Sequence, residues 1–265
     1  MEAEAGMMEN KAKKKKFTSV SKLHFVRLGY RSLLFLACLV FYVIYRLDLN
    51  VGVSYEMGLH PLVLGAVWIV YMVEMFIRFF PSRWESPGSQ KQFERNYIKT
   101  GETQIDVPDN NGTMLAALAW VCLNAPIGAL HMAGVLDDGI MILLSCAYGV
   151  CDMICILFFC PFQSWILKNK CCGSCRIYNW DYAMMFTPLL FVGGLWSWSL
   201  LALSLGLLLR WEISYHFHPE RFYEETNCSL SCAQCREKLC SHKRSLQGFL
   251  KKRAAQLGNI RKMWD

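Results

Sequence analysis

The chain has 265 residues, of which 54% are hydrophobic and only 18% are charged. Soluble domains carry roughly 25% charged residues, so this composition argues against an ordinary soluble domain and is typical of a polytopic membrane protein. The net charge of +7 is not accompanied by an aromatic stacking platform or a recognition fold, so no nucleic-acid partner is expected.

The first part of the chain contains four apolar runs of membrane length. A basic segment, residues 1–27, comes before them, and the runs cover residues 28–47, 61–80, 114–135 and 140–167. About 20 apolar residues cross the hydrocarbon core of a bilayer, so each run predicts one span. Residues 81–112 are polar and rich in Gly and Pro, which indicates a loop. Pro161 is expected to kink the fourth span near its end, because proline lacks a backbone N–H group.

The last apolar block covers residues 178–215 and is too long for one span. As a single helix it would be nearly twice as long as the hydrocarbon core is thick. Gly193 and Gly194 supply a turn, so the sequence predicts a hairpin with spans at 178–192 and 196–215.

The distribution of Lys and Arg tests the number of spans. With six spans both termini lie on one side, and only Arg46 of the 28 Lys and Arg residues faces the other side. With five spans the basic C-terminus would have to cross. Because cytoplasmic segments carry the excess of Lys and Arg, we expect an all-α bundle of six transmembrane helices. Its termini are expected in the cytosol and its location in the plasma membrane.

The sequence has thirteen cysteines, and seven of them flank the predicted hairpin on its cytosolic side. Three follow the fourth span and four lie in a Cys-rich segment, residues 216–242, after the sixth. These residues are Cys171, Cys172, Cys175, Cys228, Cys232, Cys235 and Cys240. The cytosol is reducing, so clustered thiolates there more often bind metal or do redox work than form structural disulfides.

The spacing of these cysteines favours a metal site. Cys172 and Cys175 form one CxxC pair and Cys232 and Cys235 form another, and each pair can bind one tetrahedral ion from a single tight turn. Cys171 and Cys240 are further candidate ligands. Zinc would make the site a structural staple, whereas iron or an iron-sulfur cluster would make it a redox centre. Free cysteines, or a dithiol that exchanges disulfides, are the alternatives.

Several ionisable residues lie in or at the ends of the predicted spans, where a charge is costly unless it faces protein or water. Asp152 is in the middle of the fourth span, Glu74 is in the second, and Glu212 and His216 are four residues apart at the end of the sixth. These four residues are candidates for a proton or ion path. The alternative is that they form interhelical hydrogen bonds and an interfacial anchor.

The last segment, residues 243–265, interleaves apolar residues with Lys and Arg at helical spacing. This pattern predicts a basic amphipathic helix on the bilayer, against the anionic lipids of the inner leaflet.

Two hypotheses about function follow from the sequence. In the first, the protein is a membrane redox component whose thiolate-bound iron exchanges electrons with a partner protein or a quinone. In the second, it is a transporter or scaffold with a purely structural zinc staple. No nucleotide loop, zinc-protease motif or catalytic triad is present, so the sequence assigns no catalytic residue and leaves open whether the protein is an enzyme.

Overall fold

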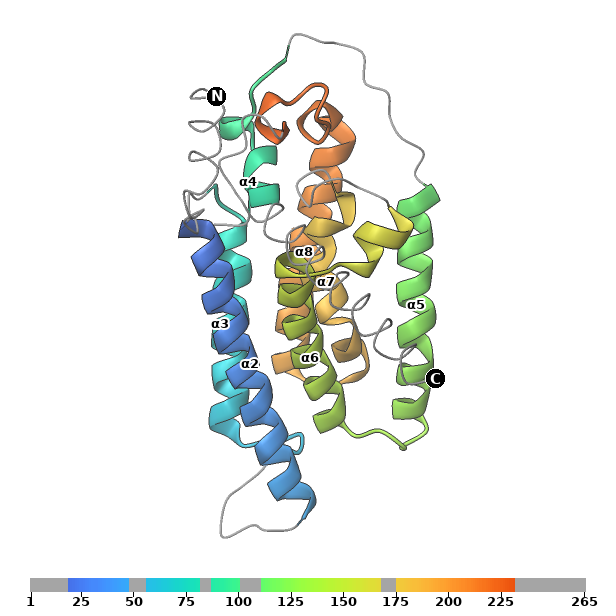
Figure 1. The fold of residues 1–265 in the computed structure, drawn as a ribbon. Helices are drawn as coiled ribbons and strands as arrows, with labels where there is room; N and C mark the ends of the chain where they lie inside the picture. The colour runs from blue at the N-terminus through green and yellow to red at the C-terminus, as the bar shows by residue number, and fades with distance from the viewer. Residues whose placement is uncertain (1–18, 48–55, 82–86, 101–110, 168–174, 232–265) are drawn as a thin grey trace, which may run out of the picture.

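The computed structural model describes residues 19–47, 56–81, 87–100, 111–167 and 175–231 (Figure 1). Apart from two isolated β-bridges, the regular elements in these ranges are all helices, which confirms the all-α class for this part of the chain. The α-helices are α2 (Ser19–Arg46), α3 (Pro61–Arg78), α4 (Pro87–Gln92), α5 (Asn111–Met132), α6 (Asp138–Leu157), α7 (Asp181–Met185) and α8 (Leu195–Phe217). Shorter elements are the π-helix η3 (Phe162–Ile166) and the 3-10 helices η2 (Glu94–Asn96), η5 (Arg176–Trp180), η6 (Thr187–Phe191), η7 (Pro219–Arg221) and η8 (Cys228–Leu230).

Four of the described helices, α2, α3, α5 and α6, are long and apolar enough to cross a membrane. Their outer faces carry large apolar side chains that are exposed, such as Leu33 at 68%, Leu62 at 78% and Leu118 at 58%. Soluble proteins rarely expose wide apolar surfaces without a partner. The length of these helices and their exposed apolar faces are therefore compatible with a membrane protein.

The sixth predicted span corresponds to α8, which has 23 residues. Among the described helices it is long enough to cross a bilayer but is not one of the four that are also apolar enough, and it carries several serines together with Arg210 and Glu212. Its start follows Gly194, which has a positive φ of 116°. The turn predicted at Gly193 and Gly194 is thus confirmed, since only glycine adopts such a φ without strain.

The predicted fourth span is too long at its C-terminal end. α6 ends at Leu157, residues 158–160 belong to no helix, and the chain resumes as the π-helix η3 after Pro161. Proline cannot donate the backbone hydrogen bond that would continue the helix. The expected kink at Pro161 is therefore a complete break between two helices.

The predicted fifth span, residues 178–192, is not one helix. The chain covers this stretch as η5, α7 and η6, with Phe186 outside the helical region between the last two. Pro188 at the start of η6 has no N–H group to bond back to α7, which favours an interruption at this point. The segment still runs along α8. It begins next to Arg176, which binds Glu212 near the end of α8, and it leads into the start of α8, where the Trp196 indole donates to the Leu64 carbonyl.

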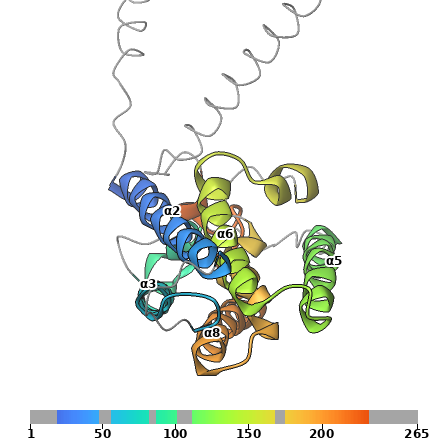
Figure 2. The same cartoon turned by 90° about the horizontal axis from the view of Figure 1, so that it is seen from below.

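The helices form an up-and-down bundle whose described ends lie together. In Figure 1 the start of α2, the end of α3, the start of α5, the end of α6 and the end of α8 all lie toward the upper end of the bundle. At the other end, Arg46 at the end of α2 lies 3.5 Å from Asp137, which caps α6. Viewed along the bundle, α2, α3, α6 and α8 gather together and α5 stands to one side (Figure 2).

The core lies where α3, α6, η6 and α8 meet. Tyr71 and Phe186 are almost fully buried and contact edge to face, with ring centroids 5.3 Å apart. Gly149 lets the hydroxyl of Tyr71 approach the backbone of α6, because a Cβ atom at this position would collide with it. This packing holds α3 against α6 just beneath the cluster of buried charges described next.

Candidate functional site

Helix α2 begins at Ser19 rather than at the predicted Leu28, and its first half carries a buried polar stripe. Four of its polar side chains lie at spacings of three or four residues, on one face of the helix. They are almost fully buried, and they are Ser21, His24, Arg27 and Arg31. The opposite face exposes Phe25, Val26 and Leu33. The helix is therefore polar toward the protein and apolar outside, as a helix surrounded by lipid must be.

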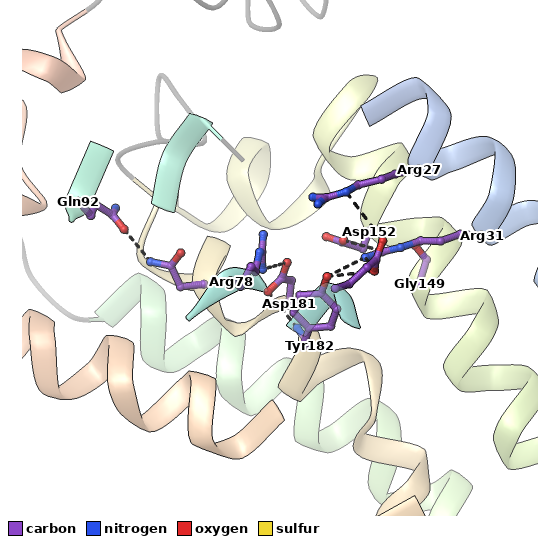
Figure 3. Close-up of polar contacts among 10 residues, drawn as sticks. Arg27, Arg31, Arg78, Gln92, Gly149, Asp152, Asp181 and Tyr182 are labelled. Carbon is purple, nitrogen blue, oxygen red and sulfur yellow. Dashed lines mark hydrogen bonds and ion pairs between the residues drawn. The ribbon is translucent and has the colours of Figure 1, made fainter. Parts of the chain in front are cut away.

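Arg31 is the centre of a charge cluster that joins α2, α3, α6 and α7 (Figure 3). Its side chain is 1% exposed. One amino group donates to Glu74 Oε2 at 2.6 Å and to the Tyr182 hydroxyl at 3.2 Å, and the other donates to Asp152 Oδ2 at 3.1 Å and to the Gly149 carbonyl at 3.0 Å. The partners lie on three other helices, Glu74 on α3, Gly149 and Asp152 on α6 and Tyr182 on α7, so one guanidinium holds several segments together.

Two further arginines complete the cluster. Arg27 lies 3.8 Å from Glu74, and Arg78 forms an ion pair with Asp181 while its guanidinium stacks 4.9 Å above the Tyr182 ring. The three arginines thus face three carboxylates, those of Glu74, Asp152 and Asp181. Because buried charges are tolerated only when they are compensated, this balance makes the cluster stable in a region of low polarity.

The predicted path residues Glu74 and Asp152 are therefore brought together, with Arg31 between them. Both can accept protons in principle, and both carry ion pairs that link helices. Glu74 makes its 2.6 Å contact with Arg31, and Arg78, four residues later on the same helix, binds Asp181. The partners come from other helices because each carboxylate points into the bundle.

A cavity of about 290 Å³ lies beside the charge cluster. It lies between α5 and α6 and is bordered by η3, η5 and α7. Most of its wall is aromatic or aliphatic, and it also includes two carboxylates and four thiols. The lining residues are Trp120, Tyr148, Cys151, Asp152, Cys155, Ile156, Cys160, Pro161, Phe162, Gln163, Cys175, Ile177, Tyr178, Asp181, Met184 and Met185.

Of the six cysteines predicted to bind metal, one lies within the described residues. Cys175 is 4% exposed, packs in an apolar cluster with Ala116 and Ile177, and forms part of the cavity wall. The others lie outside the described residues, and they are Cys171, Cys172, Cys232, Cys235 and Cys240. Among the residues that the structure does describe, no group of three or more metal-binding side chains is found.

The two cysteine-containing segments approach the same short helix, α4. Asn179, in the helix that follows Cys175, donates to the Gln92 side chain at 2.8 Å. Asn227, next to Cys228, donates to the Lys91 carbonyl at 3.0 Å. Adjacent residues of α4 therefore hold the chain just after the first CxxC pair and just before the second.

Glu212 and His216 have separate surroundings. The Glu212 carboxylate accepts hydrogen bonds from the Arg176 guanidinium and from the Trp180 indole, the latter at 2.6 Å. His216 is exposed at the end of α8 and contacts Phe217. Glu212 therefore ties η5 to α8, which fixes the residue after Cys175 at this end of the bundle.

Sequence reasoning missed Arg31, Asp181 and Tyr182. Arg31 lies inside an apolar run that was read as ordinary span, and Asp181 and Tyr182 lie in a segment read as one helix. The spacing of His24, Arg27 and Arg31 along one helix face was the available signal.

Comparisons with protein-family models, curated proteins and solved structures find no match to this chain. The function must therefore be argued from the geometry of the site itself.

Proposed function

We propose that the protein is a six-span membrane protein with both termini in the cytosol, and that it holds a thiolate-bound metal ion at that end of the bundle. The described ends of the chain lie together, which supports the even number of crossings (Figure 1). The basic residues of the N-terminal segment and the C-terminal tail favour the cytosol for that end. The basic tail binds the anionic inner leaflet in this proposal.

The observation that carries the metal proposal is the convergence of the two cysteine segments on α4. The hydrogen bonds of Asn179 and Asn227 to adjacent residues of α4 hold both segments at one end of the bundle. Two CxxC pairs that start from this common anchor supply the four thiolates of a tetrahedral site. In the proposal the ligands are Cys172, Cys175, Cys232 and Cys235, and Cys171 and Cys240 are the reserve ligands.

We propose that the metal is iron and that the protein transfers electrons between a quinol in the membrane and a soluble acceptor. The position of Cys175 supports this role, because this candidate ligand also lines the cavity beside α6. A quinol loses two electrons and two protons when it becomes a quinone. An iron ion held by these four thiolates would supply the one-electron redox chemistry that links the quinol to a one-electron acceptor protein, and Asp152 and Glu74 would take up the two protons.

A structural zinc staple is the second candidate. The complete charge compensation around Arg31 favours it, because carboxylates held by arginines lock a bundle without any transport of protons. In this role the metal would tie the segment after α6 to the tail after α8, and it would have no redox activity.

Metal analysis of the purified protein tests both candidates. We expect about one iron per chain and a visible absorption band, whereas stoichiometric zinc in a colourless protein would replace the redox role with the staple. Cys175→Ser and Cys235→Ser should each remove the metal. Cys122→Ser, at an exposed position on α5, is the matched control and should leave the metal content unchanged. A wild-type protein purified without metal would refute both candidates.

A further inference from the structure

The cavity beside the charge cluster has the properties of a binding site for a small ring molecule. We propose that it binds the neutral ring of a quinol, with one ring hydroxyl donating a hydrogen bond to Asp152. This inference rests on the proposed redox function, because it places the quinol, the electron donor of that function, in the cavity whose wall contains Cys175.

The size and wall of the cavity fit a planar apolar ring. Its volume of about 290 Å³ is at the lower end for ligand sites, which are typically about 300 to 1,000 Å³. Such a space holds a ring but not a whole lipid. Trp120 contacts Tyr148 and Phe162 at centroid distances of 4.8 and 6.2 Å, which gives one side of the cavity an aromatic surface. Aromatic rings prefer to pack against other rings in offset or edge-to-face contacts.

The polar part of the wall selects the charge of the ligand. The two carboxylates of the wall, Asp152 and Asp181, are each paired with an arginine outside the lining, Arg31 and Arg78, so their charges are compensated and do not favour an ion as ligand. Asp152 binds Arg31 through Oδ2, and its Oδ1 has no hydrogen-bond partner among the described residues. Its side chain is 18% exposed and lines the cavity. A carboxylate oxygen is an acceptor only, so the complementary group is a neutral hydroxyl donor.

Three thiols in the cavity wall can report on occupancy. Cys151, Cys155 and Cys160 line the cavity, whereas Cys122 is exposed on α5 and is not part of the wall. A bound ring should shield the wall thiols from alkylation and leave Cys122 unaffected.

The experiment measures alkylation of each cysteine by N-ethylmaleimide in detergent-purified full-length protein, with mass spectrometry to assign the sites. The ligand is decylubiquinol, kept reduced under argon, because its fully substituted ring does not add thiols. At a concentration about ten times Kd, about a tenth of the sites remain free, so alkylation of Cys155 should slow about tenfold. Decanol, which has the chain and a hydroxyl but no ring, should give no protection. Equal protection by decanol would show that the cavity takes an alkyl chain, and no protection by either would also overturn the proposal.

A pair of variants locates the protection in the cavity. Cys155→Phe fills part of the cavity and should abolish the protection of Cys151 by decylubiquinol. Cys122→Phe makes the same chemical change on the exposed face of α5 and should leave the protection intact. Unchanged protection in Cys155→Phe would place the ligand elsewhere and refute the site.

The outcome is independent of the metal test. If the wall thiols are protected in a protein that contains zinc or no metal, the proposed quinol site is supported and the proposed redox function is refuted. If the protein contains iron but its wall thiols are not protected, the metal centre is supported and the cavity is refuted as the binding site of the electron donor.

Discussion

Replacing Arg31 by methionine should destabilise the bundle more than any other single change of charge. Methionine is unbranched and apolar, so it fills much of the space but makes none of the four hydrogen bonds. Glu74 would keep its ion pair with Arg27 at 3.8 Å. Asp152 would lose its ion pair with Arg31, the only one that it forms among the described residues. Breaking a buried ion pair costs about 3–5 kcal/mol, and we expect a loss of this size in the free energy of unfolding.

The assay is a titration with sodium dodecyl sulfate of protein in maltoside micelles, followed by circular dichroism. Arg46→Met is the matched control, because the Arg46 side chain is 64% exposed and its pair with Asp137 is at 3.5 Å. An exposed pair contributes about 0–1 kcal/mol, so this control should unfold close to wild type. The double variant Arg31→Met with Asp152→Asn should recover part of the loss, because it removes the uncompensated charge. Equal stability of Arg31→Met and Arg46→Met would refute the role assigned to the cluster.

Three other substitutions test the packing with the same titration. Gly149→Ala should cost about 1–3 kcal/mol, because the new Cβ collides with the Tyr71 hydroxyl; wild-type stability would show that α3 and α6 separate readily. Gly194→Ala should cost about 1–3 kcal/mol, because an alanine is strained at φ 116°. Gly193→Ala is the control and should be near neutral, because a Cβ there has nothing within 4 Å; equal losses would contradict the turn. Asn227→Ala should cost about 1–3 kcal/mol, because the side chain is fully buried and holds α4; no loss would mean that the tail is not anchored there.

The spans with regular hydrophobic patterns could be predicted from the sequence, and the cluster that joins them could not. The second predicted span, 61–80, agrees closely with α3, Pro61–Arg78, because its apolar run is bounded by proline and by Arg78. Asp152 was also recognised as a costly charge. Its partner Arg31 was not, because the two residues are 121 positions apart and nothing local links them. Tertiary pairing of this kind carries no periodic signal.

The segments around the hairpin show a different limit of sequence reasoning. The Gly193–Gly194 pair correctly predicted a turn, but the apolar composition of 178–192 does not distinguish one helix from several short ones. The interruption at Phe186 and Pro188 is set by packing of η6 against α5 and α6, which includes the close approach of Phe191 to Gly128. The predicted metal ligands other than Cys175 lie outside the described residues, so the metal site stays a prediction.

The position of Arg31 also bears on how the chain is made. When Arg31 is added to the growing chain, Glu74 is still 43 residues and Asp152 still 121 residues from being attached. At about 5–20 residues per second, the second carboxylate follows about 6–24 s later. During this interval a lone arginine in lipid would cost several kcal/mol. We therefore expect the first helix to stay near the surface or beside the insertion machinery until α6 supplies Asp152.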